Sequence, residues 1–165
     1  MKKQTPDFIE ILKILSKHKV DFIIVGGVCA VIHGAPISTF DLDLVHSRSS
    51  QNLGRLMSAL EELGAYYRGR KDQRLKPRLF HLASGGHQLL MTELGPLDML
   101  GTIGKEHDYE GLLEHSVEQE IGGLHLRVLD LATLIQIKKE TITDKDKATL
   151  PILERTLQEK ANKNL

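Results

Sequence analysis

Two aspartates, two positions apart, are the residues of this chain best suited to chemistry. Asp41 and Asp43 belong to a run that alternates polar and apolar residues, as a strand with one buried face does. Because successive side chains of a strand point to opposite faces, both carboxylates leave one face, while Leu42, Leu44 and Phe40 are expected in the core. Two neighbouring carboxylates repel each other, and a divalent cation with a preference for oxygen ligands, such as Mg²⁺, relieves that repulsion.

A third carboxylate, Asp98, interrupts another short apolar strand pattern at 95–100. A single aspartate inside such a strand is hard to explain as packing. If Asp98 reaches Asp41 and Asp43, two metal ions about 3.5–4 Å apart can stabilise the attacking and leaving oxygens of a phosphoryl displacement. We therefore predict that these three aspartates are catalytic and bind Mg²⁺, with Mn²⁺ as the alternative ion. The competing interpretation is that they are ordinary solvent-facing acids.

A glycine pair favours the catalytic interpretation. Gly26 and Gly27 follow the buried, β-branched run 20–25 and precede a short helical pattern. Backbone N–H groups exposed at a strand-to-helix turn can hold a phosphate, although a glycine pair by itself usually marks only a tight turn. The ordered combination of strand, glycine pair, helix and later aspartates is much more specific than any of its parts.

This combination resembles the DNA polymerase beta-like nucleotidyltransferase superfamily. Within it, the chain is similar to the minimal nucleotidyltransferases and to the abortive-infection (AbiEii-like) toxins of bacteria and archaea. The resemblance is carried by residues 25–44, with support from 96–100 and 134–138. It implies a mixed β-sheet flanked by helices, with C-terminal helices packed on it.

The resemblance also implies a role for individual residues. Gly26, Gly27, Thr39 and Lys138 would contact the nucleotide, and Asp98 would activate the acceptor hydroxyl in addition to binding metal. The implied activity is Mg²⁺-dependent transfer of an NMP group from an NTP such as ATP to a hydroxyl, with release of pyrophosphate. The acceptor is left open between tRNA, a protein and a small molecule. A toxin-antitoxin pair, with an antitoxin protein as partner, is the implied biological setting.

Other features of the sequence leave alternatives open. Ile37-Ser38 stands where many toxin-like relatives carry Arg, which motivates a second hypothesis. In that hypothesis, a catalytically degenerate protein keeps the fold and binds a nucleotide, RNA or a partner. The basic run 68–78, beside Tyr66 and Tyr67, is either a landing site for an RNA acceptor or nucleotide phosphates, or a solvated loop. His33 is expected to make a structural hydrogen bond.

The remaining patterns predict the elements that position these residues. Helices are expected over 5–18, 28–33, 49–63, 130–137 and through 152–157, strands over 20–25, 41–45, 97–100 and 124–129, and a β-hairpin from 78–83 and 88–92. This order predicts an α+β sheet domain with helical C-terminal packing. We expect one domain over 1–165, with a sheet core in 1–129 and a helical part in 130–165.

Composition restricts the class of protein. The 165 residues include 22 Lys and Arg against 22 Asp and Glu, and 41% are hydrophobic. Such a chain can bury a core, and its charge balance argues against a protein that coats nucleic acid or membranes. No signal peptide or membrane span can be identified, and a lone cysteine, Cys29, excludes an internal disulfide. We expect a cytoplasmic protein without a membrane partner.

Overall fold

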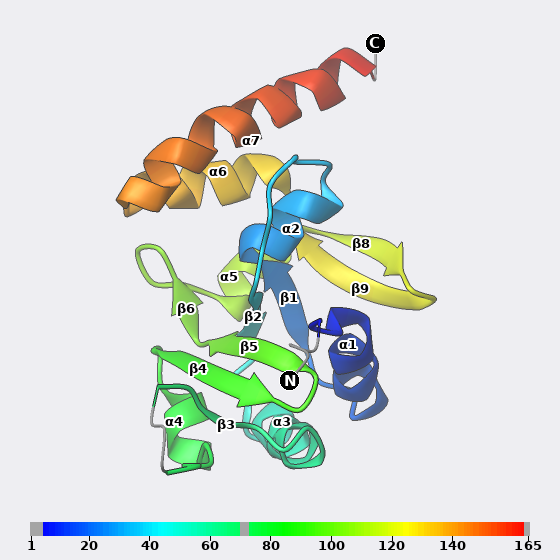
Figure 1. Ribbon diagram of the computed structural model, residues 1–165, viewed down its shortest axis with the longest axis vertical. Coiled ribbons are helices and arrows are strands. Elements are labelled where there is room, and N and C mark those ends of the chain that lie inside the picture. The colour runs from blue at the N-terminus through cyan, green and yellow to red at the C-terminus, as the bar shows by residue number, and fades with distance from the viewer. Residues whose placement is uncertain (1–4, 70–72, 164–165) are drawn as a thin grey trace.

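The computed structural model describes residues 5–69 and 73–163 and has a seven-stranded sheet at its centre (Figure 1). Its strands are β1 (Phe22–Val25), β2 (Leu42–His46), β3 (Tyr66–Tyr67), β4 (His87–Thr92), β5 (Gly95–Leu100), β8 (Ser116–Ile121) and β9 (Leu124–Leu129). The strands are arranged in the order β3-β4-β5-β2-β1-β9-β8. β2 pairs with β5 and β1 with β9 in parallel, whereas the other neighbours are antiparallel. The predicted mixed sheet is therefore confirmed.

Helices lie at both ends of this sheet. They are α1 (Phe8–Lys17), α2 (Gly26–Ile32), α3 (Ser50–Glu62), α4 (Leu79–Ala83), α5 (Tyr109–Leu113), α6 (Leu131–Glu140) and α7 (Asp144–Lys163), and a two-stranded ribbon is formed by β6 (Thr102–Ile103) and β7 (His107–Asp108). Figure 1 shows α6 and α7 at one end, next to α2, and α3 and α4 at the other. The predicted C-terminal helical packing is confirmed, because α6 contacts both α2 and α7. Over the described residues, no helix has the length and apolar character needed to span a membrane.

Local sequence explains where the first elements begin. The Asp7 side chain accepts a hydrogen bond from the Glu10 backbone N–H at 3.0 Å and caps α1, so the helix begins three residues later than the expected residue 5. All four residues of β1 are buried, because this strand lies between β2 and β9 in the middle of the sheet.

Asn52, in the first turn of α3, holds the start of β1 and the end of β2 in register. Its side chain is fully buried, accepts a hydrogen bond from Asp21 N at 2.7 Å and donates to Asp21 O at 3.1 Å and Ser47 O at 2.7 Å. Asp21 precedes β1 and Ser47 follows β2, so one amide group ties the two strands together. The resulting register sets Val25 opposite Asp43.

Two expectations about the sheet are wrong. Residues 79–83 form helix α4 instead of a strand, and β4 forms its hairpin with β5. A tight turn explains the difference, because Gly95 adopts a φ of +131° and the Thr92 hydroxyl donates to the Gly95 carbonyl at 2.8 Å. Phe40 does not enter the core: it is 77% exposed, because β2 begins only at Leu42 and the alternation does not extend back to Phe40.

Candidate active site

Asp43 and Asp98 come together because their strands are adjacent. β2 and β5 pair in parallel with Asp43 opposite Asp98, so the two side chains leave the same face of the sheet. Burial first, then the hydrogen bond and the negative charge of Asp98, and then the charge of Asp41, raise the pKa of Asp43 to about 7. In the absence of a cation, this pair therefore retains a proton near neutral pH.

Asp41 lies close to this pair but does not complete a set of metal ligands with it. It is half-buried, directly precedes β2, and acts on Asp43 through its charge. Over the described residues, no three Asp, Glu, His or Cys side chains reach the geometry that holds a metal ion. The expected convergence of three carboxylates is thus present only in part, as a contacting pair with a third acid nearby.

The glycine pair packs against Asp43 and Thr39. Gly26 adopts a φ of +68°, and a Cβ at this position would overlap the Asp43 carboxylate. At Gly27 a Cβ would lie 2.5 Å from the Thr39 hydroxyl oxygen and 2.8 Å from its Cβ. Glycine is therefore required twice, because Asp43 and Thr39 approach the backbone of the turn too closely for any side chain. Thr39 itself donates from Oγ1 to the Asp41 carbonyl at 3.2 Å.

Lys138 reaches the site from α6. A cavity of about 160 Å³ has Asp43 and Gly26 on one side and Lys138 and Asp146 on the other, and apolar residues including Leu134 complete its wall. Lys138 Nζ donates to Asp146 Oδ1 at 3.3 Å, and its positive charge opposes the rise in the pKa of Asp43. The C-terminal helices therefore contribute the cation of the cavity, while the sheet contributes the carboxylates.

Arg68 is the site residue that sequence reasoning did not assign. Its Nη1 lies 2.7 Å from Asp98 Oδ1 and donates to the Leu90 carbonyl at 2.5 Å. The contact with Asp98 is an ion pair whose geometry is not that of a hydrogen bond. Among the described residues, Asp98 Oδ1 therefore has no hydrogen-bond donor. The only signal in the sequence was membership of the basic run 68–78. That run includes 70–72, which lie outside the described residues.

The donor set fits a divalent cation. Mg²⁺ prefers carboxylate oxygens, and here Asp98 Oδ1 is buried without a hydrogen-bond donor while Asp43 keeps a proton that a cation would displace. Arg68 supplies one positive charge to this group of acids. The residues present therefore suit Mg²⁺ held by Asp43 and Asp98, with Asp41 as the nearest further acid.

His33 has the structural role expected from its place after α2. Its Nε2 donates to the Leu129 carbonyl at 2.7 Å, and Lys160 Nζ donates to its Nδ1 at 2.7 Å. Burial chiefly lowers the pKa of His33, so the ring is neutral at physiological pH. Cys29 is buried, and burial raises the pKa of its thiol to about 12, as expected of an inert cysteine. Neither group faces the cavity that contains Asp43.

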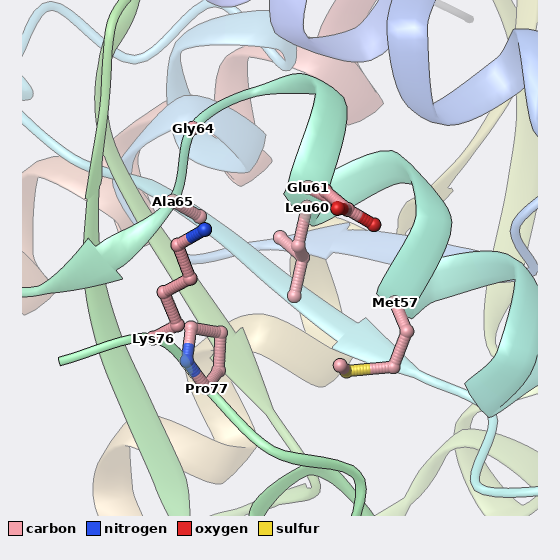
Figure 2. A pocket seen from close by; sticks show the side chains of 7 residues that line it. All are labelled: Met57, Leu60, Glu61, Gly64, Ala65, Lys76 and Pro77. Carbon is pink, nitrogen blue, oxygen red and sulfur yellow. The ribbon is translucent and has the colours of Figure 1, made fainter.

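Another pocket lies away from the carboxylates. Figure 2 shows this cavity of about 230 Å³ between α3 and the segment before α4, where Met57, Leu60, Ala65 and Pro77 give it a largely apolar lining. None of Asp41, Asp43 or Asp98 lines it. The candidate site is therefore the smaller cavity beside Asp43, where charged groups converge.

Comparison with known proteins identifies the fold. Neither known protein families nor curated protein sequences match this chain. Among solved structures, lincosamide antibiotic adenylyltransferase LnuA bound to lincomycin aligns over 89% of this chain and 94% of its own, with a TM-score of 0.58 at 14% identity. The chain thus has the fold of a nucleotidyltransferase, as its resemblance to the polymerase beta-like superfamily predicted.

Two further structures lead to the same assignment. ANT(2″)-Ia in complex with adenylyl-2″-tobramycin aligns over 94% of this chain and 90% of its own, with a TM-score of 0.57 at 17% identity. A nucleotidyltransferase-fold protein from Thermotoga maritima aligns over 94% and 93%, with a TM-score of 0.54 at 13% identity. At these identities the likeness defines the fold, and the substrates belong to those proteins.

Proposed function

We propose that this protein is a Mg²⁺-dependent nucleotidyltransferase that moves an NMP group from an NTP to a hydroxyl acceptor. The observation that carries the proposal is that Asp43 and the turn at Gly26 line one cavity with Lys138 of α6, and that Asp98 lies directly beside Asp43 on the next strand. Phosphoryl transfer needs little more of a protein than positioning and neutralisation of charge. Carboxylates for a cation, backbone N–H groups and an ammonium group meet those needs.

Each residue has a task in this reaction. Gly26 and Gly27 present their backbone N–H groups, at the start of α2, to the NTP phosphates, and Lys138 neutralises the phosphates from the opposite wall of the cavity. The Thr39 hydroxyl, next to Gly27, becomes a further donor to a phosphate when it releases the Asp41 carbonyl to which it donates. The cavity is smaller than the ligand pockets of about 300–1,000 Å³ that hold whole small molecules, so it accommodates only part of the nucleotide.

The transfer step balances with these groups. The acceptor oxygen bonds to the α-phosphorus of the NTP, the bond from that phosphorus to the oxygen bridging to the β-phosphate breaks, and pyrophosphate leaves. The hydroxyl proton passes to a carboxylate oxygen of Asp98. Mg²⁺ held by Asp41, Asp43 and Asp98 would supply charge neutralisation at the reacting phosphate.

ATP is the donor to test first. LnuA is an adenylyltransferase and ANT(2″)-Ia was captured with an adenylylated antibiotic, so adenylyl transfer occurs on this fold. We further propose that the protein is cytoplasmic and that it is the toxin of a toxin-antitoxin pair. Copurification of the chain with the product of a neighbouring gene would test the latter.

The proposed activity predicts loss of transfer when the carboxylates are neutralised. With labelled ATP and pooled RNA, protein and small-molecule acceptors, Asp43→Asn and Asp41→Asn should lower Mg²⁺-dependent label transfer by about 100-fold or more, because cation binding requires their charge. Glu118→Gln, on the exposed edge strand β8, is the matched charge-removal control and should transfer normally. Unchanged transfer in both aspartate variants would contradict the proposal.

A second candidate function has its own supporting observation. Ile37 is half-buried and packs against the core where toxin-like relatives carry Arg, and Arg68 already occupies Asp98. Both features suit a degenerate protein that binds a nucleotide without turning it over. Calorimetric binding of ATP together with no transfer to any acceptor pool would favour this candidate over the enzyme.

A further inference from the structure

A second polar cavity adjoins the candidate active site. It has a volume of about 360 Å³ and lies at the β3–β4 edge of the sheet, next to α4. Its lining residues are Tyr67, Arg68, His81, His87, Gln88 and Leu89. We name it the edge cavity.

The edge cavity and the cavity beside Asp43 lie on opposite sides of Asp98. Across the sheet, Leu89 of β4 pairs with Asp98 of β5, which in turn pairs with Asp43 of β2. Leu89 is 45% exposed and lines the edge cavity, whereas Asp43 lines the cavity with Gly26 and Lys138. The carboxylate pair is therefore flanked by two cavities, one on each side along the sheet.

Arg68 links the edge cavity to Asp98. Its Nη1 is engaged by Asp98 and by the Leu90 carbonyl. Its Nε and Nη2 have no hydrogen-bond partner within 5–69 and 73–163, the residues the structure describes. Because a guanidinium carries five N–H donors in a planar fork, the remaining donors of Arg68 can bind an anion without releasing Asp98.

His81 adds a second donor. Its Nδ1 accepts a hydrogen bond from the Arg78 backbone N–H at 3.1 Å, so in the neutral ring the proton is on Nε2. No hydrogen bond to Nε2 is formed within the described part of the chain. The ring is fixed in place, since Phe80 packs on it at 3.9 Å and Tyr67 meets it edge-on at 5.6 Å. His81 thus offers a preorganised N–H donor.

The lining of the edge cavity contains no carboxylate, so it suits an anion and not a polycation. Tyr67 donates its hydroxyl to Gln88 Oε1 at 2.6 Å, which leaves the Gln88 amide N–H groups as further donors. Among the lining residues, a polyamine such as tobramycin would meet Arg68 and histidines and no acid, since the neighbouring carboxylate, Asp98, is already paired with Arg68. A phosphate would meet the N–H donors of Arg68, His81 and Gln88.

We propose that the edge cavity binds the acceptor and that this acceptor carries a phosphate group beside its reacting hydroxyl. The proposal rests on the transferase function proposed above and specifies its second substrate. Arg68 and His81 bind the phosphate, and the hydroxyl then reaches Asp98, with the NTP on the far side of that carboxylate. Both a small polyol phosphate and the 3′ end of a polynucleotide have this chemistry.

Nuclear magnetic resonance of the full chain tests where the acceptor binds. Glycerol 3-phosphate should shift the side-chain signals of His81 and His87, while those of His125, an exposed histidine on β9, should stay in place. Glycerol and tobramycin are the neutral and polycationic controls and should shift the signals of none of these three histidines. A trinucleotide ending in a 3′-hydroxyl distinguishes the sources: a larger response to it than to glycerol 3-phosphate identifies a polynucleotide end, and the reverse a small phosphate.

The proposal is overturned if neither phosphate-bearing probe shifts His81, or if glycerol or tobramycin shifts it equally. ATP binding is monitored separately, at the backbone amides of Gly26 and Gly27. If these amide signals shift with ATP while the His81 signals shift with neither phosphate-bearing probe, only the assignment of the acceptor site is wrong. If ATP fails to bind at all, the transferase function itself is wrong.

Kinetics provide the second readout. With labelled ATP, His81→Ala should raise the KM for the better phosphate-bearing acceptor by about tenfold and leave the affinity for ATP unchanged, since one hydrogen bond to a charged group is lost. His81→Gln, which can retain an N–H donor, should recover most of that loss. His125→Ala is the matched control. An unchanged acceptor KM in His81→Ala would contradict the proposal.

Discussion

At the scale of single residues, the chemistry proposed for this protein depends on three close contacts among four residues. Asp43 touches Asp98, Gly26 admits the Asp43 carboxylate, and Arg68 neutralises Asp98. The three contacts join residues that are 55, 17 and 30 positions apart in the sequence. Each contact is energetically unfavourable or neutral by itself, so the surrounding sheet must hold it in place.

The raised pKa of Asp43 predicts a pH-dependent stability in the absence of metal. Between about pH 4 and pH 7 the folded chain binds a proton that the unfolded chain has lost, so the free energy of unfolding falls as the pH rises through this window. Asp43→Asn removes this effect and should raise Tm at pH 8 by roughly 10 °C, with little gain at pH 4. Thermal unfolding in a chelating buffer measures both values.

Glu118→Gln is the charge-removal control for this prediction, because Glu118 is an exposed residue on β8. Its Tm difference from the natural chain should not grow between pH 4 and pH 8. A uniform stabilisation by Asp43→Asn at both pH values would contradict the assignment of the shared proton. Mg²⁺ should remove the advantage of the variant at pH 8, since the cation neutralises the two carboxylates that have lost their shared proton.

Close packing at Gly27 leads to a second prediction at this scale. Gly27→Ala should lower the free energy of unfolding by about 2 kcal/mol, because its Cβ would meet Thr39. The double variant Gly27→Ala with Thr39→Gly should recover part of that loss. Gly54→Ala, in helix α3 with nothing within 4 Å of the new Cβ, is the control and should be neutral or slightly stabilising. Chemical denaturation gives all three values, and equal losses at both glycines would contradict the packing argument.

At the scale of elements, strand register determines which residues meet. The β1–β2 pairing sets Val25 opposite Asp43, and the β2–β5 pairing sets Asp43 opposite Asp98. A shift by one residue would send every carboxylate to the other face of the sheet. Asn52 fixes the open end of the β1–β2 pair through three hydrogen bonds to backbone groups of Asp21 and Ser47.

Removal of the Asn52 amide should therefore destabilise the sheet near the site. Asn52→Ala removes the side-chain hydrogen bonds to Asp21 N and Ser47 O, leaves only the backbone bond from Ser47 N to Asp21 O between these two residues, and should cost about 3 kcal/mol of unfolding free energy. Ser58→Ala, an exposed change two turns further along α3, is the control and should cost less than about 0.5 kcal/mol. Urea denaturation measures both. Amide exchange should also show faster opening of β1 in Asn52→Ala, and unchanged exchange there would contradict the role in register.

At the scale of the whole molecule, the site needs parts from both ends of the chain. The sheet supplies Asp43 and Asp98, while α6 supplies Lys138 and α7 supplies Asp146. Lys160 of α7 donates to His33 after α2, which fastens the terminal helix to the turn region. We infer that residues 1–165 form one cooperative unit, with no separately folding helical part.

Cooperative unfolding tests that inference. Calorimetry should give a single transition whose calorimetric and van't Hoff enthalpies agree, with far-ultraviolet circular dichroism changing at the same temperature. His33→Ala removes the contacts with Leu129 and Lys160 and should lower Tm without splitting the transition. Two separate transitions, in the natural chain or in this variant, would show that the helical part folds independently.

The sequence by itself was sufficient for the α+β class, the central strands and the glycine turn, because these follow from local periodicity and from glycine's conformational freedom. It also singled out Asp41, Asp43 and Asp98, whose catalytic and metal-binding roles remain predictions. It was wrong about 78–83, since a short apolar run suits a strand and a short helix equally, and only Leu82 of α4 is buried.

Only the tertiary structure decided which of these residues touch. The parallel pairing of β2 with β5 brings Asp98 to Asp43 and leaves Asp41 beside them, and the edge strands bring Arg68 to Asp98. No local pattern encodes such contacts, because they depend on the order of strands across the sheet. The equal numbers of basic and acidic residues, 22 each, do not reveal that charges of opposite sign gather in different places. Asp43 and Asp98 meet on the middle strands, while Arg68 and His81 line the cavity at the sheet's edge.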